Sequence, residues 1–244
     1  MSEDIIKSYL DKQIRYAASK ALNETGKLAI KDLQDEMERV FDRPTPYIKD
    51  GLRKTVATKD NLSITIAFKD KWAAGKGHGA ADVLYAEVFG GQRQTKAYEV
   101  LLQEKGILPQ GKVTVPGKGQ RLNQYGNITG ARITQILSVL QAFRPGTGFD
   151  ANQSEQSKRR HERSKNPNKK SPDLFYQPAT DELLEGIYER KGQKELRSVL
   201  IFVDQRRSHY RPLLRFEKII TETFDKNLQN ELDKAIEVAI ATAR

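Results

Sequence analysis

The feature that most constrains the fold is an apolar repeat at the end of the chain. After Pro212, apolar residues recur every three or four positions to nearly the last residue. This is the spacing with which one face of an α-helix is buried. The repeat predicts about 28 helical residues, roughly 42 Å in length, with the proline suited to the first turn. Its members are Leu213, Phe216, Ile220, Phe224, Leu228, Leu232, Ile236 and Ile240.

The spacing of this repeat also predicts where the helix makes contacts. Positions four residues apart on an α-helix differ by about 40° in direction, so the stripe drifts around the helix and cannot all face one surface. We expect the earlier positions, Phe216, Ile220 and Phe224, to pack on the sheet and on the N-terminal helix. The later positions, Leu232, Ile236 and Ile240, are expected to contact a neighbouring subunit.

A second apolar repeat occupies the start of the chain. It predicts a helix from residue 4 to about residue 40, and we expect one long helix rather than two, although Gly26 disfavours helix in its interior. Pro44 and Pro46 end this helix, because proline lacks a backbone N–H and restricts the residue before it. The repeat consists of Ile6, Leu10, Ile14, Ala17, Ala21, Ala29, Leu33, Met37 and Phe41.

Between the two repeats the chain carries short segments bounded by turn residues. Alternation of apolar and polar residues is typical of half-buried strands. Strands are expected at residues 63–68, 83–89, 113–115, 174–176, 186–189 and 199–203, and short helices at about 98–106 and 129–140. The predicted fold class is therefore α+β, with long N- and C-terminal helices packed on a small, mostly antiparallel β-sheet, and with a long basic insert.

The insert runs from Arg144 to Pro172 and has no apolar period. A segment without an apolar face cannot offset the entropy lost on ordering, so we expect it to be disordered or ordered only by a partner. The expected division is residues 1–143 for the N-terminal helix and the first part of the α+β domain, 144–172 for the flexible insert, and 173–244 for the returning strands and C-terminal helix of the same domain.

Half of the formal net charge of +10 lies in this insert. Between residues 155 and 170, seven basic residues minus Glu155 and Glu162 leave +5. Such a segment can contact phosphates or an acidic protein face. The candidate contact residues are Lys158, Arg159, Arg160, Arg163, Lys165, Lys169 and Lys170.

Residue types that carry catalysis or bind metals form no recognisable pattern. The absence of cysteine excludes a thiolate zinc site and a cysteine nucleophile. His78, His161 and His209 lack the spacing of metal ligands. The glycine-rich stretches at 75–79 and 116–119 lack the full spacing of a phosphate loop. We therefore expect no catalytic residue, no cofactor and no metal.

Two further groups are expected to be structural. The acidic residues of the N-terminal helix should solvate its outer face, and the aromatic residues of the later strands should fill the core rather than stack on bases. These groups are Asp32, Asp35, Glu36 and Glu38, and Tyr176, Tyr188, Phe202 and Tyr210. No apolar run approaches the roughly 20 residues that cross a bilayer, and no secretory signal pattern is seen at the start, so no membrane partner is expected.

Short motifs occur in order along most of the chain outside the insert. They are residues 42–46 (DRPTP), 57–62 (ATKDNL), 89–93 (FGGQR), 106–109 (GILP), 125–128 (YGNI), 135–138 (QILS) and 186–188 (GIY), with Tyr210 and the closing residues 239–244. Together they resemble the minor tail protein Z type of tail-completion protein from lambda-like phages. The resemblance implies a virion protein that finishes the tail and makes it competent to join the head, with neck, tail terminator and tail tip all open as its station.

Three functional hypotheses follow. The first is a non-enzymatic virion component, made in the bacterial host cytoplasm, which assembles as an oligomeric ring or head–tail connector through contacts with other tail or neck proteins and copies of itself, and which can touch DNA in the channel. The second is a nucleic-acid-binding protein that uses residues 155–170 as a phosphate-contacting arm. The third is a hydrolase or nuclease without a familiar signature. No small-molecule substrate is expected.

Overall fold

The fold is α+β, as the sequence predicts, with long helices at both ends and small antiparallel sheets between them. The computed structural model describes residues 3–69, 79–144, 152–163, 172–192 and 195–242. The chain divides into two compact units. Unit 1 comprises Met1–Gly90 with Arg211–Arg244, and unit 2 comprises Gly91–Tyr210.

These limits differ from the expected division at residues 143 and 172. The strands after residue 172 pair with a strand from the first half of the chain, and the C-terminal helix packs on the N-terminal helix. Each unit is thus completed by segments far apart in the sequence, a pairing that local patterns do not encode.

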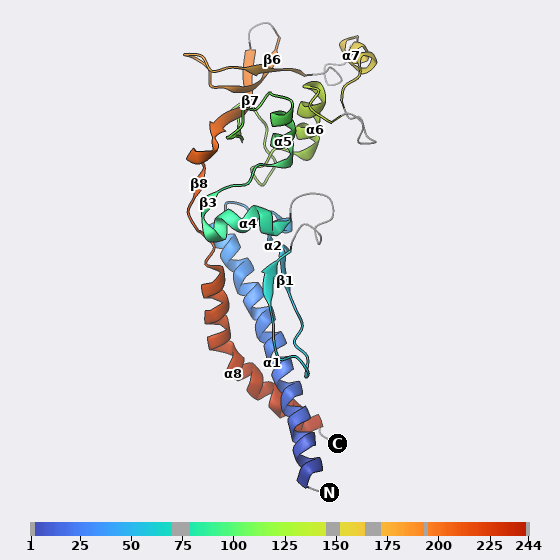
Figure 1. Cartoon of the computed structure of the whole chain (residues 1–244), viewed down its shortest axis with the longest axis vertical. Helices are drawn as coiled ribbons and strands as arrows, with labels where there is room; N and C mark the ends of the chain where they lie inside the picture. Colours follow the sequence, from blue (N-terminus) through green and yellow to red (C-terminus); the bar gives the residue numbers. More distant parts are fainter. Residues whose placement is uncertain (1–2, 70–78, 145–151, 164–171, 193–194, 243–244) are drawn as a thin grey trace. The chain divides into compact units, whose positions relative to one another are not determined.

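Unit 1 is built on an antiparallel pair of long helices, α1 (Glu3–Val40) and α8 (Phe216–Thr242). They lie side by side, with the first turns of α1 and the last turns of α8 at the same end (Figure 1). As expected, α1 is one helix that continues through Gly26. The Thr223 hydroxyl of α8 donates to the Asp32 carboxylate of α1 at 2.6 Å, so a side-chain hydrogen bond also joins the two helices.

A two-stranded ribbon lies along α1 and explains the glycine in that helix. The ribbon pairs β1 (Leu52–Lys54) with β2 (Ile66–Phe68). A Cβ on Gly26 would lie 2.2 Å from the Ile64 Cδ1, so the missing side chain gives the ribbon room. The Asn23 side chain bonds both backbone groups of Ala57, at 2.8 and 3.0 Å, and so fixes the loop of the ribbon to the helix.

The prediction of a strand at residues 83–89 is wrong, because this segment belongs to helix α4 (Ala80–Phe89). Its apolar and aromatic residues favour strands locally, but Ala80, Leu84 and Val88 recur every four positions and lie against the unit 1 core. The Asp82 carboxylate also accepts a hydrogen bond from the Gly79 N–H at the helix start. Tertiary packing thus overrides the local preference.

Most of the apolar burial in unit 1 lies where α1, α4, α8 and the ribbon meet, beside the short helix α2 (Pro46–Lys49). Phe216 and Ile220 pack there, and the rings of Phe216 and Phe68 are 4.8 Å apart. The early part of the C-terminal stripe therefore packs on the N-terminal helix as expected. The sheet beside it is the two-stranded ribbon. The buried members are Leu33, Met37, Leu52, Leu84, Leu214 and Ile219.

Unit 2 contains a four-stranded antiparallel sheet in the order β4-β7-β6-β5. Its strands are β4 (Lys112–Pro116), β5 (Asp173–Gln177), β6 (Gly186–Lys191) and β7 (Glu195–Asp204). The strands expected at 113–115, 174–176, 186–189 and 199–203 are confirmed. Outside this sheet, β3 (Gly91–Gln92) pairs with β8 (His209–Tyr210), and the 3₁₀ helix η2 (Gln205–Arg207) lies between β7 and β8 in the chain.

Two helices pack on this sheet, α5 (Ala97–Glu104) and α6 (Gly130–Val139). Both were expected. The Thr129 hydroxyl caps α6 by accepting from the Arg132 N–H, and Gly106 follows α5 with a φ of 75°, a conformation that glycine adopts without strain. The core between helices and sheet is formed by Leu102, Leu108, Ile136, Leu137, Leu174, Ile187, Val199, Leu200 and Phe202.

Residues 152–163 of the basic insert are described, and the flexibility expected for residues 144–172 stays a prediction. Helix α7 (Glu155–Glu162) forms within it. The signal for this helix is its cap rather than an apolar stripe: the Ser154 hydroxyl accepts from the Ser157 N–H at 3.2 Å. The Asn152 side chain bonds both backbone groups of Phe143 and ties the segment to the end of α6. Residues 145–151 and 164–171 lie outside the described residues.

Gly117→Ala is expected to destabilise the protein by about 1–3 kcal/mol, as over-packing does. A Cβ at this position would lie 2.4 Å from the Ser198 backbone oxygen, so strand β7 would have to shift. Gly130→Ala is the matched control, since a Cβ there meets nothing within 4 Å. Thermal unfolding of both variants measures the difference. Equal stability of the two would show that the Gly117 approach is not tight.

Candidate assembly surfaces

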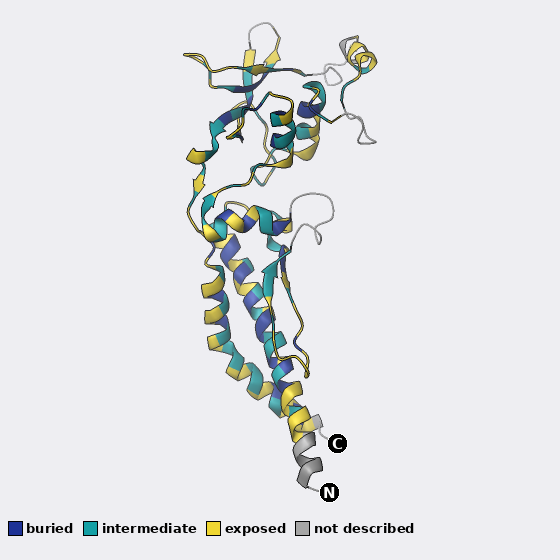
Figure 2. Cartoon of the chain, viewed as in Figure 1, coloured by how far each residue is buried: buried dark blue, intermediate teal, exposed yellow. Residues whose placement is uncertain are grey.

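The apolar stripe of α1 continues beyond the part of the helix that α8 covers. Ala17 is buried against Ala235 and Ala239 of α8, and Ala21 is buried as well. On the same face, Leu10 and Ile14 lie toward the start of the helix and are 53% and 58% exposed. Figure 2 shows this change from buried to exposed along α1. A helix face that is apolar but uncovered is typical of a surface that another protein covers.

The stripe of α8 drifts as its four-residue steps predict. Leu228, Leu232 and Ile236 are half-buried, and Ile240 is 70% exposed. Ala235 and Ala239 take the positions that face α1, where their small side chains allow the helices to come close. The drift therefore turns Ile240 away from α1, and leaves Leu232 and Ile236 partly engaged within the subunit.

We define the stem end as the exposed apolar residues Leu10, Ile14 and Ile240 of unit 1. Of the three expected interface residues, the structure leaves only Ile240 largely exposed, because Ile236 packs on the alanine cluster and Leu232 is half-buried. Leu10 and Ile14 belong to the apolar repeat that predicts the N-terminal helix, and their exposure is a finding of the structure. The N-terminal repeat predicts a helix of about 37 residues and the C-terminal repeat one of about 28, so the shorter helix cannot cover the whole length of the longer one. This difference in length could have indicated that part of the N-terminal apolar face is exposed.

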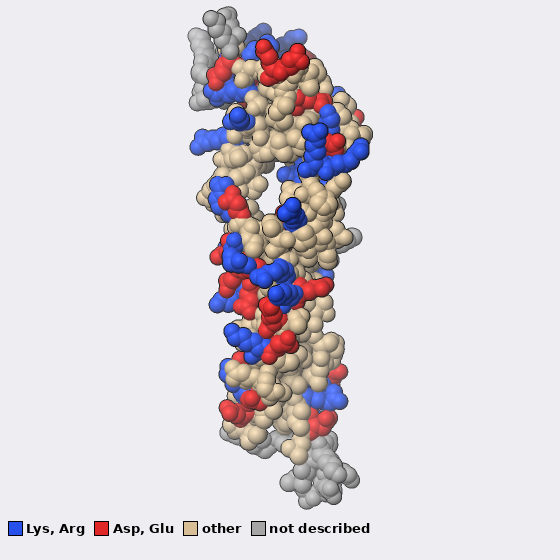
Figure 3. Space-filling view, turned by 90° about the vertical axis from the view of Figure 1, so that its left-hand side faces the viewer, with Lys and Arg blue, Asp and Glu red and all other residues tan. Residues whose placement is uncertain are grey.

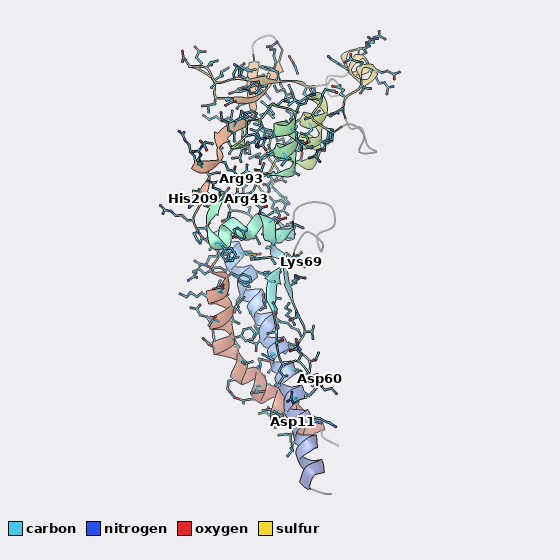
Figure 4. The ribbon with its side chains drawn as sticks, viewed as in Figure 1. Asp11, Arg43, Asp60, Lys69, Arg93 and His209 are labelled. Carbon is cyan, nitrogen blue, oxygen red and sulfur yellow. The ribbon has the colours of Figure 1, made fainter. Side chains whose placement is uncertain are left out.

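The sides of the helix pair are solvated. On the face shown in Figure 3, lysine and arginine alternate with aspartate and glutamate along the helical part of unit 1. Asp11 of α1 and Asp60 of the ribbon loop lie toward the stem end (Figure 4). Glu36 departs from the expected solvating role, because its carboxylate is buried and joined to Arg39 and Arg215.

The basic segment has a second exposed surface. Lys158, Arg159 and Arg160 lie exposed on α7, and Arg163 is exposed just after it. Within the described residues, no ion pair involves these four side chains. Their charge is therefore available to an anionic partner. The remaining candidates, Lys165, Lys169 and Lys170, lie outside the described residues.

The most concentrated electrostatic arrangement is a buried ion pair in unit 2. Glu99 on α5 is fully buried and accepts two hydrogen bonds from the Arg93 guanidinium, at 2.6 and 2.9 Å. It also accepts from the Lys96 N–H and from the N–H and hydroxyl of Thr114 on β4, at 2.7 to 2.8 Å. Arg93 in turn donates to the Thr114 carbonyl at 3.1 Å.

This arrangement holds the carboxylate in its charged form. Burial alone would raise the pKa of Glu99, but the hydrogen bonds from Arg93 and from the two backbone N–H groups outweigh it and lower the pKa from its usual 4.5. Burial raises the pKa of neighbouring Tyr98 to about 12, and its hydroxyl lies 2.7 Å from the Thr114 hydroxyl. Both carboxylate oxygens are engaged, so the cluster offers no free base.

Other candidate chemical groups lie apart. Burial raises the pKa of Glu87. Among the described residues, its Oε2 has no hydrogen-bond partner and no nucleophile bonds to it. His209 is exposed on β8, near the Arg93 end of unit 2 (Figure 4). The structure does not describe His78 or the side chain of His161. Within the described ranges, no cluster of three metal-binding side chains occurs.

The glycine-rich stretch after β4 does not form a phosphate loop. The Gly117 and Gly119 N–H groups donate to the backbone oxygens of Val199 and Ser198, so they extend the pairing with β7. A phosphate site would need such N–H groups to point at the ligand. The stretch at 75–79 lies, except for Gly79, outside the described residues.

The expected core role of the later aromatic residues is confirmed for two of them. Tyr188 and Phe202 are buried, whereas Tyr176 is 40% exposed beside Phe202 and Tyr210 is half-buried on β8. In the part of the chain that is described, no helix is both long enough and apolar enough to span a bilayer.

Comparison of the chain with protein-family models, with curated proteins and with solved structures finds no match.

Glu99→Gln is expected to destabilise the protein by about 3–5 kcal/mol at neutral pH, because it leaves the Arg93 charge buried without its partner. The stabilisation by Glu99 is present above its unfolded pKa and is lost as the pH falls through the lower folded pKa, so the difference from wild type should shrink well below pH 4.5. Glu104→Gln, which removes the exposed pair with Arg144, is the control and should change little. Denaturant unfolding at several pH values measures both.

Proposed function

We propose that this chain is a structural, non-enzymatic component of a tailed-phage virion, at the tail or the head–tail junction, and that it works by binding protein neighbours. The observation that carries the proposal is the stem end, where apolar helix faces extend beyond the part that the subunit itself covers. The family resemblance of the motifs supports the phage assignment.

The small apolar area that is buried between α1 and α8 at the stem end also supports an assembly role. Three buried alanines, with Ile236 packed against them, form the cluster there, so little apolar area is buried between the helices. Because burial contributes about 25 cal/mol per Å² of apolar surface, the intramolecular contact at this end is weak compared with the leucine-rich core near α4. A neighbour that covers Leu10, Ile14 and Ile240 adds the missing burial.

A second candidate role, contact with DNA or an acidic protein face, is favoured by α7. Three adjacent exposed basic residues on a short helix give a local positive charge that binds phosphates without sequence preference. This role is compatible with a virion position near the DNA channel. It does not require the stem end.

Ile240→Asp is expected to leave a folded protein that fails to enter particles, since the residue is exposed in the subunit and a charge there prevents apolar contact. Electron microscopy and protein analysis of particles made with and without the variant measure incorporation. Val56→Asp, at a similarly exposed apolar position in the loop of the ribbon, is the matched control and should assemble normally.

Two results would contradict the proposal. One is normal incorporation of Ile240→Asp, which would show that the stem end is no interface. The other is absence of the wild-type chain from purified particles. Phe224→Asp, at a half-buried position of the same helix, is expected to lower stability and so separates folding from assembly.

Replacing Lys158, Arg159 and Arg160 by serine is expected to weaken binding to duplex DNA and to flatten its salt dependence by about 0.9 in log–log slope for each phosphate that is no longer neutralised. Thermal stability should stay nearly unchanged, because these side chains are exposed. Replacement of three other exposed lysines, Lys12, Lys31 and Lys226, is the equal-charge control. An equal effect of both triple variants would show that net charge, not α7, governs binding.

A further inference from the structure

The two edges of the four-stranded sheet in unit 2 differ in whether they are closed. A sheet edge presents unpaired backbone N–H and C=O groups, which can pair with another chain unless they are blocked. The edges are β4 and β5. Among the described residues, side chains bond the backbone of β4 but not that of β5.

Side chains seal the β4 edge. The Thr114 N–H donates to the Glu99 carboxylate, and the Thr114 carbonyl accepts from Arg93, so the buried ion pair acts as a substitute for a neighbouring strand. The Lys112 carbonyl accepts from the Gln103 side chain at 3.3 Å, and Pro116 has no N–H to offer. A further strand cannot add to this edge without displacing the ion pair.

Among the described residues, no side chain seals the β5 edge in this way. No side chain of the described residues bonds the backbone of β5, and β6 is its one extensive neighbour among the described elements. The Glu185 carbonyl accepts from the Phe202 N–H of β7. The backbone groups of the next residue, Gly186, therefore point the other way, toward its partner Gln177 on β5. Because backbone direction alternates along a strand, Leu174 and Tyr176 turn their backbone groups away from β6.

One local hydrogen bond uses this edge. The Leu174 N–H donates to the Pro172 carbonyl, two residues earlier, at 3.1 Å. A bond over two residues closes a γ-turn, and its bent geometry makes it weaker than a bond of a strand ladder. An added strand can therefore replace the Pro172 carbonyl as the acceptor.

We propose that β5 is a homotypic interface at which β5 of a second copy adds antiparallel about a two-fold axis at Phe175. The two sheets would join into one. Leu174 of each copy would exchange backbone hydrogen bonds with Tyr176 of the other, and the two Phe175 residues would meet as a non-hydrogen-bonded pair. This deepens the assembly role proposed above but uses a surface of unit 2 that is separate from the stem end.

The side chains of β5 suit this pairing. In the antiparallel register, Leu174 lies opposite Tyr176, which covers the tyrosine ring that is 40% exposed in one copy. Asp173 lies opposite Gln177, so no like charges oppose each other across the strands. Pro172 and Pro178 flank the strand and restrict pairing to its five residues.

The sealed β4 edge determines the symmetry. A head-to-tail sheet contact between copies needs two open edges and leads to rings or filaments, whereas a single open edge permits only a self-complementary pair. A strand pair of five residues is also small, so the contact should be weak in dilute solution and strengthened where an assembly brings copies together.

Cysteine trapping tests the proposal in the full chain, which has no cysteine of its own. Under mild oxidation, Phe175→Cys should form disulfide-linked dimers about tenfold faster than Val115→Cys, because only the former is held opposite its own copy. A non-hydrogen-bonded pair places the Cα atoms about 4.5 Å apart, within the range of disulfides. Val115 is a strict control, since it lies on the sealed β4 edge and is 39% exposed.

The register has its own readout. A mixture of Asp173→Cys and Gln177→Cys chains should cross-link to each other about tenfold faster than either does to itself, since pairing holds the two thiols opposite each other, whereas parallel pairing would favour self-linking. Adding Phe175→Lys to the Asp173→Cys and Gln177→Cys chains should abolish the excess, because two like charges would then oppose each other. Equal rates for Phe175→Cys and Val115→Cys would overturn the proposal. The Ile240→Asp variant should cross-link normally through Phe175→Cys, so failure of one surface is distinguishable from failure of the other.

Discussion

The antiparallel contact between α1 and α8 is the constraint on which unit 1 depends. It joins the two ends of the chain, and the ribbon, α2 and α4 have a core to pack on only because both helices are present. Its interior changes along its length from leucine, methionine and isoleucine near α4 to alanine near the stem end. The same contact therefore supplies stability at one end and leaves apolar surface uncovered at the other.

The main constraint on unit 2 is different: a small sheet has two edge strands whose backbone groups lack a neighbouring strand. Burying an ion pair costs free energy, because two charges must be removed from water. Here the Arg93 and Glu99 groups find enough hydrogen-bond partners to hold their charges, and they block the backbone of β4 as they do so. The pair is better explained by this structural role than by catalysis, since both carboxylate oxygens are engaged inside the fold.

The two units thus present different kinds of surface to partners. The stem end offers apolar helix faces, α7 offers exposed positive charge, and the β5 edge offers backbone groups with two flanking prolines. These three surfaces use the hydrophobic effect, electrostatics and main-chain hydrogen bonding respectively. Each responds to a different change, since a charge placed in the apolar face, the removal of positive charge and a disrupted strand pairing can be introduced independently.

The sequence by itself determined the long terminal helices, the α+β class and most strands, because helical and strand periodicities are local properties. The drift of the α8 stripe also followed from spacing alone; of the three positions expected at an interface, Ile240 is exposed whereas Ile236 packs on the alanine cluster. Only the tertiary structure decided that residues 83–89 are helical, since their strand-favouring side chains are overruled by packing at Leu84 and Val88. It alone showed which edge of the sheet is closed, because the bonds of Arg93 and Glu99 to Thr114 join residues whose proximity no local pattern specifies.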